Sequence, residues 1–99
     1  MTTKAHSPIT PGEILLTEFL EPLGITPYRL AQATGLTQTR VSEVIHGKRR
    51  ITTDTALRLS KALGLSERFW LNLQNDYDIE TEHDRHQTQL DNVELLVTV

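Results

Sequence analysis

A run of hydrogen-bonding side chains lies between positions 37 and 43, at a spacing that would place most of them on the outer face of one short helix. The amide of Gln38 can bond both N6 and N7 of adenine, and the guanidinium of Arg40 can bond O6 and N7 of guanine. Glu43 could accept from N4 of cytosine or could only orient Arg40, and the sequence leaves both roles open. Hydroxyl groups on the same face suit phosphate oxygens. This chemistry is that of a contact with double-stranded DNA, carried by Thr37, Gln38, Thr39, Arg40, Ser42 and Glu43.

Positive charge flanks this polar face on both sides. Lys48, Arg49 and Arg50 follow directly after Gly47, where the phosphates beside a bound helix would lie, and Arg29 precedes the face. Hydrogen-bonding side chains between cations are typical of a nucleic-acid-binding surface. The alternative is an ordinary pair of helices whose polar outer surface is only hydrated.

Two short helices that meet at a tight corner would present this face. Between positions 27 and 46, the small side chain of Ala31 allows the helices to approach, and Gly35 allows a positive φ at the corner. Val41 follows Gly35 by six positions and Val44 comes three later, where they would pack the second helix beneath the first. The pattern predicts a helix-turn-helix whose second helix is exposed along its outer face, as entry into a major groove requires.

The rest of the chain predicts an all-α domain of five helices. Thr10, Pro11 and Glu13 form a capping box that begins the first helix, which we expect to end at Pro22 and Gly24. We expect a Thr or Ser to cap each of the other four helices, and a glycine to follow three of them. The expected caps are Thr26, Thr37, Thr52 and Ser66, and the expected stops are Gly35, Gly47 and Gly64.

Length and composition restrict the class of protein. A chain of 99 residues, 37% of them hydrophobic, predicts one small domain with little room for a deep enclosed pocket. The absence of cysteine excludes disulfides, thiolate chemistry and cysteine-based zinc sites. Because no long apolar run and no secretory signal are present, we expect a cytoplasmic protein with no membrane partner.

Charge is unevenly distributed along the chain. The net charge of −3 would argue against a nucleic-acid partner, but residues 26–68 hold eight Lys and Arg against three acids. Residues 69–99 hold seven acids against Arg85 alone. A basic middle and an acidic end indicate two surfaces with two partners, although a hydrated surface of uneven charge would give the same counts.

The segment over 28–65 resembles the Cro/repressor-type helix-turn-helix family, the XRE class, and is most similar to its HigA/VapI branch of bacterial antitoxins. With the flanking motifs, the resemblance covers residues 8–78. Five motifs carry the resemblance, and the one at 69–74 is the most specific for the branch. The motifs are Pro-Gly-Glu-Ile-Leu at 11–15, Gly-Lys-Arg at 47–49, Ile-Thr at 51–52, Asp-Thr-Ala-Leu-Arg-Leu at 54–59 and Phe-Trp-Leu-Asn-Leu-Gln at 69–74.

This resemblance implies a five-helix domain that binds its operator as a homodimer, represses its own operon and neutralises a small basic ribonuclease toxin of the RelE-like type. It implies neither the operator sequence nor the toxin-binding residues, because the recognition face and the ends of the chain vary within the branch. One alternative is a plain XRE-family transcriptional repressor without a toxin partner. Another is a protein-interaction domain that has kept this fold and lost DNA binding.

The fifth predicted helix carries apolar side chains on two sides. Phe69, Leu73 and Tyr77 share a helical stripe, and Trp70 and Leu71 add apolar surface beside it. One side can serve the core while the other is left for a dimer partner, unless all of these side chains belong to the core of one protomer. The predicted interface consists of Trp70, Leu71, Leu73, Gln74 and Tyr77.

The end of the chain has a different character from the rest. We divide the sequence into an N-terminal arm at 1–9, a DNA-binding domain at 10–78 and an acidic tail at 79–99. Positions 78–92 are almost wholly polar and predict a frayed helix end or a loop. Apolar residues then alternate as in a short strand, which would pack down, stay disordered or pair with another chain. The acids of the tail could dock the basic toxin or could only keep the chain hydrated. The alternating residues are Val93, Leu95, Val97 and Val99.

Signals for catalysis are weak. His83 and His86, beside Glu82 and Asp84, imitate a metal cluster, but they lie in a polar segment without a third rigid ligand. The sequence contains no glycine-rich phosphate loop, no HExxH motif and no nucleophile elbow. We therefore predict that the chain is not an enzyme, binds no metal and takes no cofactor.

Overall fold

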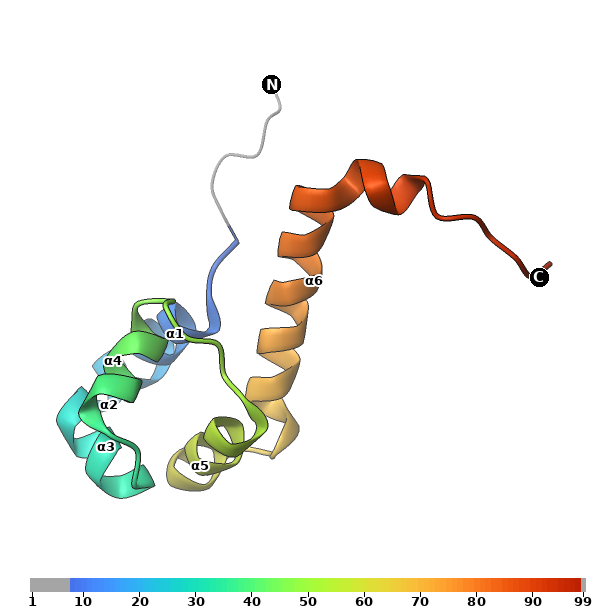
Figure 1. Ribbon diagram of the computed structural model, residues 1–99. Helices are drawn as coiled ribbons and strands as arrows, with labels where there is room; N and C mark the ends of the chain where they lie inside the picture. The colour runs from blue at the N-terminus through green and yellow to red at the C-terminus, as the bar shows by residue number, and fades with distance from the viewer. Residues whose placement is uncertain (1–7, 99) are drawn as a thin grey trace.

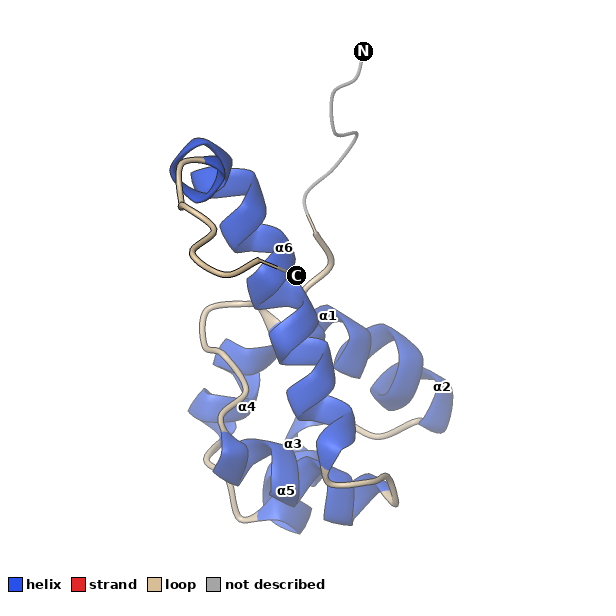
Figure 2. Cartoon of the chain, turned by 90° about the vertical axis from the view of Figure 1, so that its right-hand side faces the viewer, coloured by secondary structure: helices blue, strands red, loops and turns tan. Residues whose placement is uncertain are grey.

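The computed structural model describes residues 8–98, and all the regular secondary structure within them is helical. Five helices follow one another in that part, and no strand forms there (Figures 1 and 2). The prediction of an all-α domain is confirmed. The arm predicted at 1–9 lies mostly outside the described residues. The elements are α1 (Pro11–Ile14), η1 (Leu15–Leu20) and α2 (Glu21–Leu23), which form one continuous helix, then α3 (Pro27–Thr34), α4 (Gln38–Ile45), α5 (Thr53–Leu63) and α6 (Arg68–Asp91).

The first helix passes through Pro22 instead of ending there. In a regular α-helix the ring of Pro22 would clash with the carbonyl of Glu18. The turn ahead of the proline widens to a π-helix, in which the N–H of Glu21 donates to the carbonyl of Leu16, five residues earlier. The wider turn relieves the conflict, and the helix ends at Gly24, where φ is 68°.

Threonine side chains cap four of the helices, as predicted. Each hydroxyl accepts from the backbone N–H three residues later, at 3.0 to 3.5 Å. The fifth predicted cap is wrong, because α6 begins at Arg68 after Glu67. Ser66 takes part through its backbone carbonyl, which accepts from the N–H of Phe69 at 3.2 Å. The four threonine caps are Thr10, Thr26, Thr37 and Thr52.

Trp70, at the start of α6, is the largest fully buried side chain. The centroid of its ring lies 5.2 Å from that of Phe19 and 5.0 Å from that of Phe69, in tilted and edge-to-face arrangements that aromatic rings favour. Aliphatic side chains from every other helix belong to the same core. They include Leu15, Leu20, Leu30, Val41, Val44, Ala56 and Leu59.

The last helix, α6, is longer than the sequence predicts. It continues to Asp91 and projects beyond the other helices in both views (Figures 1 and 2). Polar pairs four residues apart support it: His86 Nδ1 pairs with Glu82, and His83 Nδ1 lies 3.1 Å from Gln87 Oε1. Such pairs stabilise the later part of α6, which has no apolar stripe. The prediction of a frayed end or loop over 78–92 is therefore wrong for nearly all of that stretch.

The helix bends near its end, and the tail beyond it forms no strand. At His86 the backbone leaves the helical region, with φ −128° and ψ 27°, and Figure 1 shows the turn in the ribbon. Residues 93–98 are exposed and irregular. The strand predicted there is absent, because a single strand finds no backbone partner in a helical chain. Val99, the last residue of the predicted strand, lies outside the described residues.

Among the described residues, none of the helices combines the length and the apolar character that crossing a membrane requires.

Candidate nucleic-acid interface

Helix α4 turns its apolar residues inward and its polar residues outward. Val41 and Val44 are each 2% exposed, whereas Gln38 and Thr39 are exposed at the N-terminal end of the helix. Arg40 is half-buried, and within residues 8–98 its guanidinium has no acidic partner. Gln38, Thr39 and Arg40 therefore lie at the outer face, and no side-chain hydrogen bond or ion pair found within residues 8–98 uses them.

The corner between α3 and α4 has the geometry that the sequence predicts. Gly35 has a φ of 77°, a conformation that favours glycine. The hydroxyl of Thr34 donates to the carbonyl of Leu30 at 2.8 Å and accepts from the N–H of Leu36 at 3.3 Å. These bonds connect the end of α3 to the first residue after the corner.

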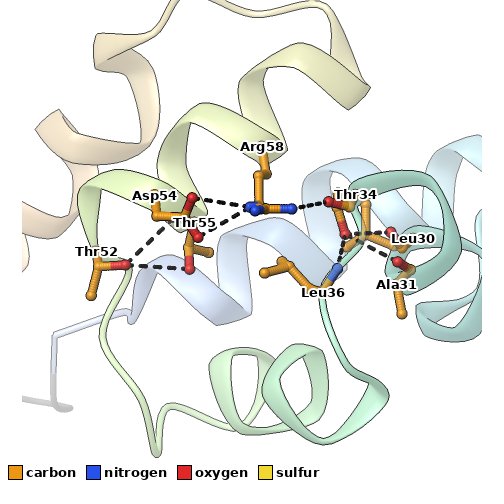
Figure 3. Close-up of polar contacts among 8 residues, drawn as sticks. All are labelled: Leu30, Ala31, Thr34, Leu36, Thr52, Asp54, Thr55 and Arg58. Atoms are coloured by element: carbon orange, nitrogen blue, oxygen red, sulfur yellow. Dashed lines mark hydrogen bonds and ion pairs between the residues drawn. The ribbon is translucent and has the colours of Figure 1, made fainter.

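Arg58 of α5 fixes the same corner from outside. Its Nη1 donates to the carbonyl of Thr34 at 2.7 Å, and its Nε donates to both carboxylate oxygens of Asp54 at 3.1 Å (Figure 3). Thr34 is the last residue of α3, so its carbonyl has no partner within the helix. A Cβ added at Gly35 would lie 3.0 Å from Nη1 of Arg58. Arg58 was not among the residues predicted for the site, since its role depends on a contact 24 residues away.

The chain turns back along α4 after the helix ends. The N–H of Gly47 donates to the carbonyl of Val44 at 3.1 Å, and that of Lys48 donates to the carbonyl of Glu43 at 2.8 Å. Together with the φ of 74° at Gly47, these bonds form a Schellman motif. Arg49 Nε lies 2.8 Å from Glu43 Oε1, so Glu43 pairs with Arg49 and not with Arg40. One of the two roles left open for Glu43, the orientation of Arg40, is wrong.

Arg50 points away from this face and toward α6. Its Nη2 donates to Asp78 Oδ2, while Gln74 Nε2 donates to Asp78 Oδ1 at 2.9 Å. Gln74 Oε1 in turn accepts from the N–H of Ile51 at 2.8 Å. This network ties the segment after α4 to the last helix. Sequence reasoning missed it, because its partners lie 23 and 28 residues apart.

The other predicted DNA-contacting residues lie around α4. Arg29 and Lys48 are exposed and have no acidic partner within the described part of the chain. The hydroxyl of Thr37 is used as the cap of α4. Ser42 lies beside His46, whose Nδ1 is 2.8 Å from the Ser42 carbonyl and 3.3 Å from its Oγ. His46 was not among the residues predicted for the site, although its spacing of four residues from Ser42 places the two side chains side by side on a helix.

The residues predicted for a dimer interface fall into two groups. Trp70 is 0% exposed and Gln74 is 4% exposed within a single protomer, so neither side chain has surface left for a partner. For these two residues the interface prediction is wrong, and the alternative of core packing applies. Leu71, Leu73 and Tyr77 are half-buried and keep part of their surface.

The histidines of α6 are engaged by neighbours on the same helix. His86 pairs with Glu82 and His83 contacts Gln87, each four residues away. Over residues 8–98, no three His, Asp or Glu side chains are grouped as metal ligands.

Comparison with known proteins places this arrangement in a family. A family model described as Helix-turn-helix (HTH_3) matches residues 16–70. Antitoxin HigA-1 of Vibrio cholerae serotype O1 is 40% identical over 89 residues, which cover 90% of this chain and 84% of that protein. Virulence-associated protein I of Dichelobacter nodosus is 40% identical over 83 residues, which cover 83% and 77%. The solved structure of Pseudomonas aeruginosa antitoxin HigA with the higBA promoter has a TM-score of 0.85 and 36% identity, covering 91% of this chain and 99% of that one. The chain therefore belongs to the HigA/VapI antitoxin branch of the Cro/repressor-type helix-turn-helix family.

Proposed function

We propose that this protein is a sequence-specific DNA-binding antitoxin that represses its own operon as a dimer. The observation that carries the proposal is the outer face of α4, where Gln38, Thr39 and Arg40 are available at the N-terminal end. A recognition helix enters the major groove by this end, and amide and guanidinium groups then reach base edges. The relative solved with a promoter supports the same use of this domain.

The negative net charge is compatible with this proposal, because acids and bases occupy different parts of the molecule. Most acids of the C-terminal third lie on the part of α6 that projects beyond the other helices, or in the tail (Figure 1). Cations flank α4 instead, with Lys48 and Arg49 after it and Arg29 before it. A local excess of positive charge attracts a polyanion even when the whole protein is acidic.

We propose that two copies pair through α6. Leu71, Leu73 and Tyr77 keep part of their surface, and Leu95 and Leu96 in the tail are 73% and 84% exposed. Apolar surface of this kind marks protein contacts. A two-fold pair would present its two α4 helices to successive major grooves, about 34–36 Å apart. We expect sedimentation velocity to give a dimer at micromolar concentration, and Leu71→Glu to shift it toward the monomer.

We propose a small basic ribonuclease toxin as the second partner. Exposed acids such as Asp76, Asp91 and Glu94 make the C-terminal third of the chain negative. A protein that binds RNA is positively charged, so the two charges are complementary. We expect this protein to co-purify with the product of the adjacent gene and to abolish its ribonuclease activity. Failure of both would favour the plain repressor without a toxin partner.

DNA binding is tested with the duplex that lies upstream of its own gene and a scrambled duplex of the same composition. We expect the upstream duplex to bind at least about a thousandfold more tightly at physiological salt. Affinity for both duplexes should fall steeply as salt rises, because phosphate contacts release counterions. Equal affinity for the two duplexes would contradict sequence-specific repression.

A further inference from the structure

Glu43 holds the segment after α4 in two independent ways. Its backbone carbonyl accepts from the N–H of Lys48 at 2.8 Å, as part of the Schellman motif. Its carboxylate Oε1 accepts from Nε of Arg49 at 2.8 Å. The first bond sets the path of the backbone and the second sets the direction of one cation. Both bring the segment back onto the helix that it has just left.

The three cations of this segment consequently have different environments. Arg50 is turned to α6 by its pair with Asp78. Lys48 has no acidic partner within the described residues. Arg49 alone is drawn to α4, by a residue that follows Arg40 by three positions and so shares its helix face.

We infer that Glu43 is a positioning residue and that Arg49, which it holds, reads a base edge next to the one contacted by Arg40. The inference rests on the proposed DNA binding. A guanidinium whose Nε–H bonds a carboxylate keeps both terminal amino groups, and these can bond O6 and N7 of one guanine. In this arrangement Arg49 uses Oε1 of Glu43, so the carboxylate is oriented by the cation that it holds.

The value of the pair lies in preorganisation. The side chains are 46% and 36% exposed, and ion pairs at this level of exposure add little to folding stability. Holding a long, flexible side chain near its bound position lowers the entropy lost when DNA binds. Substitution of Glu43 should therefore leave the melting temperature nearly unchanged and affect discrimination between DNA sequences.

The test uses the full chain with the variants Glu43→Gln, Arg49→Lys and the double variant. Fluorescence anisotropy gives the dissociation constants for the upstream duplex and the scrambled duplex. Glu43→Gln should lower the ratio of the two affinities about tenfold, and Arg49→Lys, which keeps the charge but not the planar fork, should do the same. The double variant should lose no more than either single variant, since both remove one interaction.

Glu18→Gln is the matched control. It removes the same charge from an exposed position on the first helix and should leave the ratio unchanged. If Glu43→Gln behaves like this control, Glu43 acts only through net charge and the inference is wrong. If Glu43→Gln still lowers the ratio in the Arg49→Lys background, Glu43 contacts DNA itself. If Arg49→Lys leaves the ratio unchanged, Arg49 meets a phosphate and not a base. A wild-type protein that fails to distinguish the duplexes would overturn the proposed function, and this inference with it.

Discussion

Gly12 of α1 lies directly against the carbonyl oxygen of Val44 in α4. A Cβ at position 12 would be only 1.7 Å from that oxygen and 3.1 Å from the Cα of Ile45. Gly12 is buried in a helical segment, so the position requires space and not an unusual backbone conformation. The first helix thus supports the recognition helix through a contact between two main chains.

Gly12→Ala should destabilise the protein by about 3 kcal/mol or more, because neither backbone can yield without disturbing the core. Urea unfolding followed by circular dichroism measures the loss. Gly64→Ala is the control, since its φ is +75° but nothing lies within 4 Å of the added Cβ. That change should cost about 1–2 kcal/mol through backbone strain alone. Equal losses for the two variants would contradict the close contact.

Arg58→Ala should destabilise the protein by about 1–2 kcal/mol, because the carbonyl of Thr34 loses a charged donor at 2.7 Å. The Arg58 and Asp54 side chains are 44% and 60% exposed, so their ion pair adds little to this figure. Lys61→Ala, on the exposed side of the same helix, should change stability by less than about 0.5 kcal/mol. Urea midpoints that are the same for both variants would show that Arg58 does not hold the corner.

Arg40→Ala should weaken binding to the upstream duplex by about 1–3 kcal/mol, which is the loss of one bidentate contact to guanine. Anisotropy titration measures it, with Arg68→Ala as a variant that removes the same charge from the start of α6. The loss should be much smaller on the scrambled duplex. A uniform loss on both duplexes would make Arg40 a phosphate contact.

Lys48→Ala should weaken binding to all duplexes by a similar factor and reduce the slope of log affinity against log salt by about one. Arg50→Ala should change this slope less, because Asp78 already neutralises that guanidinium. Titrations at four or more salt concentrations compare the two variants. A larger change for Arg50→Ala would show that DNA displaces Asp78 from its partner.

Local signals in the sequence were sufficient for the recognition helix and its corner. The Thr37 cap acts within three residues, and the positive φ of Gly35 is one that glycine adopts readily; the distant contact from Arg58 was not needed to predict either feature. The inward positions of Val41 and Val44 follow from helical spacing. Each of these features depends on neighbours in sequence, so the pattern of residues was enough to predict it.

Contacts between distant segments could not be predicted in this way. A glutamine on a helix normally faces water, but Gln74 is buried because the N–H of Ile51, 23 residues away, needs an acceptor. The residue type and position of Arg50 predict a DNA contact, and only the position of α6 shows that Arg50 pairs with Asp78. The length of α6 was missed for a different reason, since its last turns rest on local polar pairs four residues apart, which leave no apolar stripe.

The supports of α4 share one property. Gly12 meets the carbonyl of Val44, Arg58 binds the carbonyl of Thr34, and Gln74 binds the N–H of Ile51, all of which are main-chain atoms. Every residue type except proline presents these atoms in the same way, so the scaffold is indifferent to the identity of the side chains at 38, 39 and 40. If these side chains read base edges as we propose, mutations there would direct the protein to a new DNA sequence while its architecture stays intact.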